Sequence, residues 1–353
     1  MPRVLIVATG RKTRGGITSV IKAYENSYIW KKYHCHWIQT HRDGAAWRKI
    51  LYFLVGLLDY ILRLPFYDII HIHISHNTTA KRKSIFMFLA KLMKKETVIH
   101  FHAFNVEDSI LGTCKGYYKY LFDKADRVLV LSRWWKKQVE SVFLLPTHKL
   151  QILYNPCPFV NQDNSKKLPI ILYAGTINQR KGYADLIKAF SRIASKYPKW
   201  KVIFIGNGEI EKGKELARSL QAESQIEFLG WVSGDRKDEI FRKTTVFCLP
   251  SFAEGFPMAV LDAWAYGLPV ITTPVGGIPD IAVDGENMLL FNPGDVDTLA
   301  RQLERMITDE HLRNHISEAS YRFATHEFDI DTISKQLDNL YAELLSKKEQ
   351  LFF

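Results

Sequence analysis

One stretch of this sequence carries more information than any other: Pro250-Ser251-Phe252-Ala253-Glu254-Gly255-Phe256-Pro257-Met258-Ala259-Val260-Leu261-Asp262. It places the carboxylate of Glu254 in a turn that contains glycine and proline. The apolar segment that follows, residues 258–266, is predicted to be a helix, because Gly267 and Pro269 supply a stop and a breaker. Pro257 suits the first helical turn, and Asp262 lies inside the helix.

This arrangement indicates a particular kind of ligand. The free N–H groups and the dipole of a helix N-terminus attract phosphate. A carboxylate beside that anion cannot bind it, so its natural partners are hydroxyl groups of a sugar or ribose. The stretch therefore suggests a sugar-nucleotide site at Glu254 and Asp262. The alternative left open is that Glu254 caps the helix and Asp262 is a solvated helix residue.

Length and composition set the frame. A chain of 353 residues exceeds one typical core, so two domains are expected, and 47% hydrophobic and 24% charged residues are ordinary globular values. The four cysteines are far apart and form no metal-ligand spacing, which predicts buried thiols in a reducing cytosol. The apolar run at residues 2–7 is predicted to be a first strand and not a signal peptide.

The charge is unevenly distributed. Residues 1–160 carry 25 Lys and Arg against 10 Asp and Glu, a net charge of +15, which leaves −4 for residues 161–353 of the whole-chain +11. Only the first half is therefore expected to meet an anionic partner, such as membrane phospholipid, a lipid diphosphate or nucleic acid.

Continuous apolar runs alternate with helical patterns along the chain, which predicts parallel sheets in two α/β units. The expected strands are residues 4–8, 36–40, 68–75, 97–101, 127–131, 150–153, 170–174, 201–206, 226–229, 245–249, 269–273 and 288–291. The polar stretch at residues 161–167 is the predicted linker. Open parallel sheets bind ligands at the carboxyl ends of their strands, so function is expected there.

Two loops at strand ends carry suitable chemistry. After the first strand, Gly15 and Gly16 permit close approach of backbone to an anion at a helix start, although the spacing is neither a dinucleotide fingerprint nor a P-loop. After the strand at residues 170–174, Arg180 and Lys181 beside a glycine could neutralise a diphosphate. For each loop, a simple solvated turn is the alternative.

Histidines follow two of the expected strands. His100 and His102 share a face of one strand, and His102, at its end, could donate to a sugar hydroxyl. His71 and His73 lie on the preceding strand. Four histidines also raise the question of a metal, but no carboxylate or cysteine completes the set at ligand spacing, so no metal is expected.

The chain resembles glycosyltransferases of family 4, of the group 1 bacterial type. The family's pattern of Glu, seven residues, then Glu within a longer run is matched by the residues 250–257, 262–273, 276–280 and 284–287. Weaker similarities in family order are found at Gly15-Gly16, His102, Ser132, Asn155-Pro156 and Lys181-Gly182. The resemblance implies the retaining class and the α/β fold known as GT-B, with two facing Rossmann-like domains. It implies an acceptor domain at residues 1–165, a nucleotide-sugar domain at residues 166–328, and a C-terminal helix, residues 329–353, that packs back on the first domain.

The resemblance also implies roles for single residues. Glu254 would contact the donor sugar, with His102 reaching it from the first domain, and Asp262 would hold the ribose. Lys181 would neutralise the diphosphate, with backbone N–H groups supplied at Gly15 and Gly16. The donor-binding turn would comprise Gly255, Phe256, Pro257 and Met258.

Two departures from the family pattern affect this assignment. Asp262 stands where Glu is usual, which shortens the reach by one methylene, and Thr176 stands where Arg is frequent, which leaves Arg180 as the nearest substitute. We expect a site that uses Lys181 and helix N-termini in place of a divalent metal or other cofactor. The implied reaction is front-face transfer from a nucleotide-diphosphate sugar, with the departing diphosphate as base.

The basic first half suggests the acceptor. Residues 45–64 combine aromatic and aliphatic side chains with flanking Arg48, Lys49 and Arg63, and are too short and charged to span a bilayer. We expect an amphipathic helix at the inner face of the membrane of a cytoplasmic enzyme, assisted by Lys81-Arg82-Lys83 and Lys94-Lys95, with an ordinary core helix as the alternative. The acceptor would then be a saccharide or a lipid-diphosphate-linked sugar in surface polysaccharide assembly.

Other classes of protein are also considered. A sugar-nucleotide epimerase of the same fold and an inactive sugar-nucleotide-binding relative remain open. A nucleic-acid-binding protein is disfavoured, because the basic residues are scattered over helices and accompany no nucleic-acid-binding motif.

Overall fold

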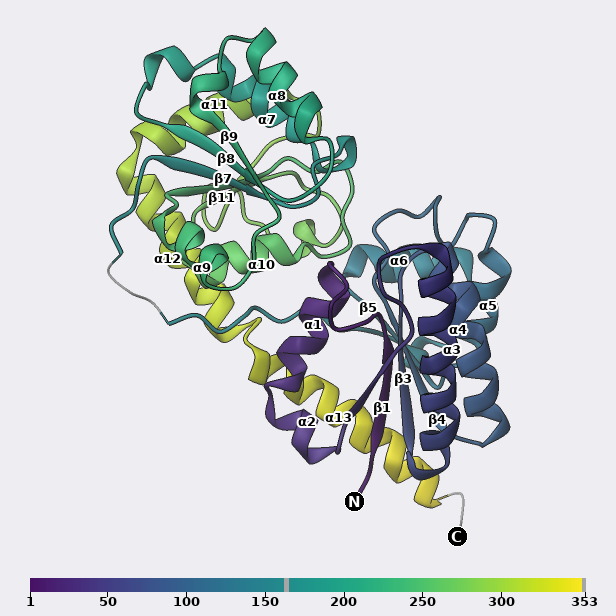
Figure 1. Ribbon diagram of the computed structural model, residues 1–353. Helices are drawn as coiled ribbons and strands as arrows, with labels where there is room; N and C mark the ends of the chain where they lie inside the picture. Colours follow the sequence, from purple (N-terminus) through teal and green to yellow (C-terminus); the bar gives the residue numbers. More distant parts are fainter. Residues whose placement is uncertain (162–164, 351–353) are drawn as a thin grey trace. The chain divides into compact units, whose positions relative to one another are not determined.

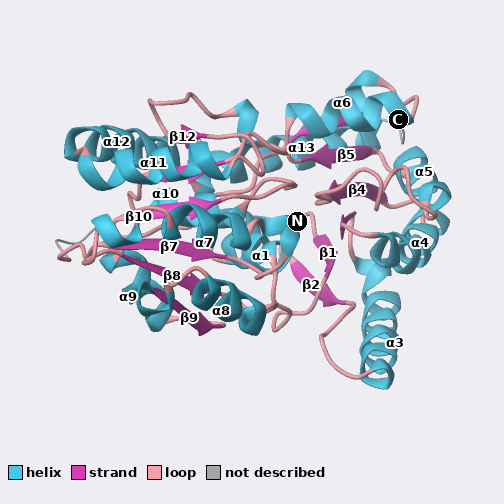
Figure 2. Ribbon diagram, turned by 90° about the horizontal axis from the view of Figure 1, so that it is seen from above, coloured by secondary structure: helices cyan, strands magenta, loops and turns pink. Residues whose placement is uncertain are grey.

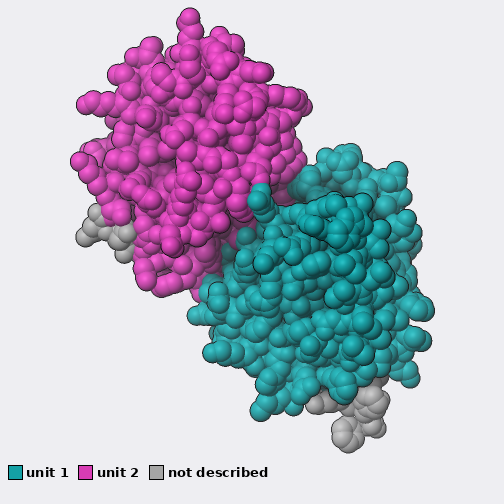
Figure 3. All heavy atoms as spheres, in the orientation of Figure 1, with its two compact units in different colours: residues 1–156, 330–353 teal, residues 157–329 magenta. Residues whose placement is uncertain are grey.

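The protein forms two compact units in the computed structural model, which describes residues 1–161 and 165–350. The first unit contains residues 1–156 and 330–353, and the second contains residues 157–329 (Figures 1 and 3). The chain enters the second unit between residues 156 and 157 and returns to the first between residues 329 and 330. The boundaries predicted from the sequence were 165/166 and 328/329. Of the expected linker at residues 161–167, residues 162–164 lie outside the described part of the chain.

The first unit is built on a sheet of six parallel strands in the order β2-β1-β3-β4-β5-β6. Its strands are β1 (Val4–Ala8), β2 (His36–Gln39), β3 (Ile69–Ile74), β4 (Glu96–Phe101), β5 (Arg127–Val130) and β6 (Leu150–Ile152). Most of their side chains are buried on both faces, which explains their continuous apolar sequences.

Helices cover both faces of this sheet (Figures 1 and 2). The unit contains α1 (Gly16–Glu25), α2 (Tyr28–Lys32), α3 (Ala46–Arg63), α4 (Asn77–Leu92), α5 (Lys115–Lys124), α6 (Arg133–Val142) and α13 (Ile330–Gln350). Helices α3 to α6 share one core with β1, β3, β4 and β5. Helices α1, α2 and α13 pack together on the opposite face.

The last helix, α13, is part of the first unit. Its apolar stripe at Ile333, Leu337, Tyr341 and Leu344 is almost completely buried, at the spacing of one helix face. Polar contacts fix the register: Asp338 accepts hydrogen bonds from Lys32 and Tyr33 at 2.7 and 2.6 Å. The hydroxyl of Tyr341 lies 2.6 Å from Nδ1 of His71, in the middle of the sheet.

The second unit has its own six-stranded parallel sheet, in the order β12-β11-β10-β7-β8-β9. The strands are β7 (Ile170–Ala174), β8 (Lys201–Ile205), β9 (Ile226–Gly230), β10 (Val246–Leu249), β11 (Val270–Thr272) and β12 (Leu289–Leu290). Numbered within the unit, this is the Rossmann order 3-2-1-4-5-6, which reverses direction between β7 and β10. A ligand crevice is therefore expected where those two strands end.

Two layers of helices enclose this sheet as well. They are α7 (Tyr183–Ser191), α8 (Ile210–Ser219), α9 (Asp235–Lys243), α10 (Met258–Ala265), α11 (Val296–Thr308) and α12 (Glu310–His326). Helices α7, α8 and α11 cover one face, and α9, α10 and α12 cover the other (Figure 1).

All twelve predicted strands are present, and each end differs from the prediction by at most one residue. The two-unit α/β architecture is therefore confirmed. The prediction of four buried thiols is wrong for two of them: Cys157 and Cys248 are buried, whereas Cys35 and Cys114 are partly exposed. Neither lies in a strand, so the apolar runs that identified the sheet gave no information about them.

Gly182 offers a test of how tightly the loops after β7 and β10 are packed. It has a φ of +68°, and a Cβ there would lie 1.8 Å from the carbonyl oxygen of Pro250. Gly182→Ala should lower the Tm of the protein by several degrees, because it combines left-handed strain with a clash against backbone. Gly234 is the matched control, since its φ of +59° is similar but a Cβ would meet no atom within 4 Å. Gly234→Ala should lower Tm by about 3 °C, and an equal effect of the two substitutions would contradict the close approach.

Candidate functional site

The predicted donor-site residues of the second unit lie at the point where its sheet reverses order. Arg180 and Lys181 form a short 3-10 turn, Gln179–Lys181, in the loop after β7. Glu254 lies in the loop after β10, the strand that pairs with β7. Two motifs that are 73 residues apart in the sequence therefore meet at the topological switch point of the sheet, where ligands of open α/β sheets bind.

A buried ion pair forms the centre of this site. The carboxylate of Glu254 is only 6% exposed, and Oε1 accepts hydrogen bonds from the ammonium of Lys181 and, at 2.6 Å, from the hydroxyl of Ser251. Arg180 Nη1 lies 3.7 Å from Oε2. A buried charge requires such partners, because desolvation of an unpaired carboxylate costs several kcal/mol. Burial lowers the pKa of Lys181, although the charge of Glu254 acts in the opposite direction.

Backbone contacts hold the two loops together. The side chain of Asn178 caps the turn by accepting from the N–H of Lys181 at 3.0 Å. Phe252 N donates to the carbonyl of Arg180 at 2.7 Å, and Arg180 Nη1 donates to the carbonyl of Ala253 at 2.7 Å. Arg180 thus bridges the loops, which is a structural role besides the charge predicted for it.

Helix α10 begins at Met258, directly after Gly255, Phe256 and Pro257. Its first turn contains no acidic residue, and within the described part of the chain no side chain caps its N–H groups. The N-terminus of the helix therefore offers its dipole and its backbone donors to an anion. Gly255 and Phe256 are buried, so the turn that leads into the helix is fixed.

Asp262 is paired in a way that the sequence did not indicate. Its Oδ2 accepts a hydrogen bond from Lys237 of α9 at 2.7 Å, and its side chain is 20% exposed. Lys237 also lies over the ring of Phe241. Asp262 is therefore not an isolated solvated residue. A ligand hydroxyl could bind its carboxylate only beside the ammonium of Lys237. Lys237 and Ser251 are the site residues that sequence reasoning missed; Ser251 stands three positions before Glu254, whereas Lys237 carries no sequence signal.

In the first unit, Gly15 and Gly16 form the start of α1, after the loop that follows β1. Gly15 has a φ of +148°, and both residues are exposed. The first turn of α1 has no acidic residue. The backbone N–H groups at this helix start are therefore suited to bind an anion, and the predicted contact with the diphosphate stays a prediction.

The four histidines of β3 and β4 form a stack inside the first unit. His71, His73 and His100 are at most 2% exposed, and the ring centroids of neighbouring pairs lie 4.6–5.4 Å apart. His102 follows the end of β4 and is partly exposed, and its Nε2 lies 2.9 Å from Nδ1 of His73. This contact with His73 fixes the orientation of the His102 ring.

These histidines also contain the candidate metal ligands. One nitrogen from each of His71, His73 and His100 lies within 4.8 Å of the others, and among the described residues no cysteine or carboxylate joins the group. A metal ion lies in the plane of an imidazole that binds it. The rings of His71 and His73 are instead stacked at an interplanar angle of 13°, so their nitrogen lone pairs run parallel and do not converge.

Lys83 corrects one prediction about the basic surface. The sequence suggested that Lys81-Arg82-Lys83 all face an anionic partner, but Lys83 is 1% exposed. Its ammonium donates to the carbonyls of Val7 and His73 at 2.7 and 2.9 Å, and thereby links the ends of β1 and β3. Arg82 is partly buried as well and donates to His41, so Lys81 is the member of this group that lies on the surface.

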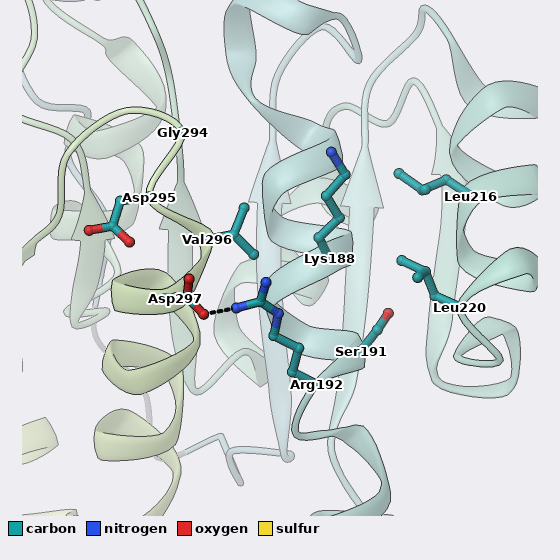
Figure 4. A pocket seen from close by; sticks show the side chains of 9 residues that line it. All are labelled: Lys188, Ser191, Arg192, Leu216, Leu220, Gly294, Asp295, Val296 and Asp297. Atoms are coloured by element: carbon teal, nitrogen blue, oxygen red, sulfur yellow. Dashed lines mark hydrogen bonds and ion pairs between the residues drawn. The ribbon is translucent and has the colours of Figure 1, made fainter.

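A separate pocket of about 690 Å³ lies on the outer side of the second unit (Figure 4). It is lined by Lys188, Ser191 and Arg192 of α7, by Leu216 and Leu220 near α8, and by residues 294–297 at the start of α11. Arg192 forms an ion pair with Asp297 across it. None of the predicted site residues lines this pocket.

Comparison with known proteins agrees with this geometry. Residues 159–323 match the model of the family described as "Glycosyl transferases group 1". An uncharacterized glycosyltransferase of Methanocaldococcus jannaschii is 26% identical over 80% of this chain and 76% of its own length. The lipopolysaccharide core biosynthesis glycosyltransferase LpsE of Rhizobium meliloti is 29% identical over 53% of this chain and 52% of its own. The second half of the chain is therefore similar to group 1 glycosyltransferases, which agrees with the predicted resemblance at that level; the assignment to family 4 stays a prediction.

A solved structure shows the same fold. The Anabaena protein HepE, crystallised with UDP and glucose, superposes with a TM-score of 0.77 over 97% of this chain and 100% of its own, at 16% identity. The predicted GT-B class is thereby confirmed.

The histidine stack makes a prediction about acid stability. Burial lowers the pKa of His100 to about 3, whereas the unfolded chain has a value near 6.5. Below about pH 6.5 the imidazole of His100 is protonated in the unfolded chain but stays neutral in the folded protein. The free energy of unfolding therefore decreases as the pH falls from about 6.5 toward 3. The wild-type protein should lose roughly 2 kcal/mol more of its free energy of unfolding between pH 7 and pH 5 than the His100→Phe variant. The decrease in Tm over this range should therefore be about 5 °C smaller in the variant.

The control for this experiment is His148→Phe at an exposed position, which should leave the pH dependence of Tm unchanged. If His100→Phe and the wild-type protein lose the same Tm between pH 7 and pH 5, the buried neutral imidazole is not a source of acid sensitivity.

Proposed function

We propose that this protein is a retaining glycosyltransferase that moves a sugar from a nucleoside-diphosphate sugar to an acceptor hydroxyl, without a metal ion at the donor site. The observation that carries the proposal is the buried pair of Glu254 and Lys181 beside the start of α10. The ammonium of Lys181 can bind the diphosphate of a sugar nucleotide, and the carboxylate of Glu254 beside it can bind hydroxyl groups of the sugar. HepE, whose fold this chain shares, was solved with UDP and glucose.

The residues divide the work as follows. An ammonium has three donors, and Glu254 takes one of those of Lys181, so the others can neutralise the diphosphate as it departs. The N-terminus of α10 stabilises the same charge through backbone N–H groups. Glu254 keeps Oε2 for sugar hydroxyls, and Asp262 binds the ribose in company with Lys237.

The first unit supplies the remaining groups. His102 would donate to a hydroxyl of the donor sugar, and Gly16 would offer a backbone N–H to the diphosphate. Because Glu254 is engaged with cations and sugar hydroxyls, a double displacement through this carboxylate is disfavoured. The acceptor would attack from the face of the leaving group, with the diphosphate as base.

Lys181→Ala tests the leaving-group role. It should lower kcat by on the order of 100-fold, and at least as much as it weakens donor binding, because the charge that it stabilises grows in the transition state. Turnover is measured with a panel of sugar nucleotides, after thermal shift has identified the donor. Lys188→Ala, an exposed lysine on the following helix, is the matched control and should be neutral. Unchanged turnover of Lys181→Ala would rule out this role.

We also propose that the acceptor is lipid-linked and that the enzyme works at the inner face of a membrane, in surface polysaccharide assembly. LpsE, one of its relatives, bears the name of a lipopolysaccharide core enzyme. Among the described residues, no helix is long and apolar enough to cross a bilayer. A lipid-linked acceptor would therefore be met from the surface.

Helix α3 supplies a surface for this contact. Only Gly56 and Tyr60 of this helix are buried, which favours a surface helix over an ordinary core helix for this segment. Its outer side exposes a row of large apolar residues: Trp47, Ile50, Leu51, Leu54, Val55, Leu58, Ile61 and Leu62. Leu54 and Leu58 are 54% and 59% exposed, values that soluble proteins rarely collect on one helix. Arg48 and Lys49 lie on the same helix and would favour anionic lipid.

Leu54→Glu with Leu58→Glu should abolish binding to vesicles that contain phosphatidylglycerol, because two charges replace apolar side chains in the contact. Sedimentation with vesicles at low salt measures the bound fraction, and vesicles of pure phosphatidylcholine should bind the wild-type protein more weakly. Val283→Glu, at an exposed apolar position of the second unit, is the control. A wild-type protein that ignores anionic vesicles would contradict the membrane proposal and leave the transfer chemistry untouched.

A further inference from the structure

A second pocket, of about 600 Å³, lies on the outer surface of the first unit between α4 and α5. Ser84, Ile85 and Phe88 of α4 form one wall, and Gly116, Tyr117 and Tyr120 of α5 form the other. Its lining is mostly apolar, and the two tyrosines add an amphipathic edge. None of the predicted donor-site residues contributes to it.

This pocket continues the apolar surface of α3. Helix α3 packs on α4 through the edge-to-face ring pair of Phe53 and Phe86, and Tyr60 donates to the carbonyl of Phe86 at 2.8 Å. On the outer side of α4, Ile85, Phe88 and Leu92 are exposed, Phe88 by 56%. Helices α3, α4 and α5 therefore form one layer, in which α3 and α4 expose apolar residues and the pocket lies between α4 and α5.

Two exposed basic residues lie close in sequence to the residues that line the pocket. Lys81 lies one turn before Ile85 on α4, and Lys115 precedes Gly116 on α5; both are exposed. Helix α4 contains no acidic residue, and α5 contains only Asp123, which pairs with Lys119. An occupant with an apolar body and an anionic head matches this distribution of charge.

We propose that this pocket holds the first part of the hydrocarbon chain of the lipid-linked acceptor, with the phosphate of the lipid on Lys81 and Lys115. The inference rests on the proposed function and adds a site to it. A flat bilayer contact needs only the exposed row on α3, whereas a recess between two helices fits a single chain that is lifted out of the bilayer. The pocket lies beside the middle of α4 and the first two turns of α5. Helix α4 begins where β3 ends, at the edge of the sheet that carries His102.

Gly116 allows the pocket to be filled without disturbing the fold. It lies in the first turn of α5, and a Cβ built there meets no atom within 4 Å, because it enters the pocket. Gly116→Ala should therefore be neutral or slightly stabilising, since alanine favours the helix. Gly116→Phe should occupy the space of the chain, and an unchanged Tm would show that the variant is folded.

The probe is dodecyl phosphate below its micellar concentration, with binding measured by isothermal titration calorimetry on the full chain. The wild-type protein and Gly116→Ala should bind it, and Gly116→Phe should bind it at least tenfold more weakly. Butyl phosphate, which has the same head and little chain, and dodecyltrimethylammonium, which has the same chain and the opposite charge, should both bind poorly. Equal affinity of Gly116→Phe and wild type, or of the phosphate and the ammonium probe, would overturn the proposal.

This experiment separates the pocket from the membrane surface. The Leu54→Glu, Leu58→Glu variant should lose vesicle binding and keep its affinity for dodecyl phosphate, whereas Gly116→Phe should do the reverse. If vesicle binding fails in the wild-type protein while the probe still binds in the predicted order, the membrane proposal falls and the chain pocket stands. If Lys81→Ala with Lys115→Ala binds dodecyl phosphate as tightly as the wild type, these two lysines have no part in recognition and the proposal is wrong.

Discussion

The central constraint on this protein is that a parallel sheet covered by helices on both faces can expose polar groups only where its strands end. In the second unit, β7 and β10 are neighbours at which the order of the sheet reverses, so the loops that follow them lie at its topological switch point. Lys181 and Glu254 lie in those two loops and pair there. The position of the predicted donor-site residues is thus a consequence of strand order.

Burial gives this arrangement its rigidity. A carboxylate that is 6% exposed must be satisfied, and Glu254 is satisfied only when Lys181 and Ser251 are in place. The close approach of Gly182 to the backbone of Pro250 fixes the distance between the loops that carry them. Charged groups are therefore held before any ligand arrives, which reduces the reorganisation that binding or transfer would require.

The first unit separates two kinds of surface on opposite faces of one sheet. Toward α1 and α13, histidines of β3 and β4 stack in the interior, and Tyr341 and His102 mark the two ends of that polar stack. Toward α3, α4 and α5 the core is apolar, and the apolar character continues to the outside of α3 and α4. The unit thus presents polar groups at one edge of its sheet and apolar groups on the outside of these two helices.

Much of this could be predicted from the sequence, because the information is local. Continuous apolar runs identified all twelve strands, and the residues around Glu254 identified the helix start. Gly15, Gly16, Lys181, His102 and Asp262 were predicted as site residues because each stands at the end of a strand or inside a recognisable run; their roles stay predictions. The amphipathic pattern of residues 45–64 was visible too, although the pattern alone did not separate a core helix from a surface helix.

Only the tertiary structure decided the partners. Lys237 pairs with Asp262 from another helix, Lys83 turns inward to link two strands, and Arg180 binds backbone; a basic residue in sequence looks the same in all three cases. The exposure of α3 and the pocket between α4 and α5 likewise depend on which helix faces are covered by neighbours. Local sequence determines what a residue can do, because propensity and periodicity act over a few residues. Which charge is buried, and which apolar face is left open, is determined by contacts between segments far apart in the chain.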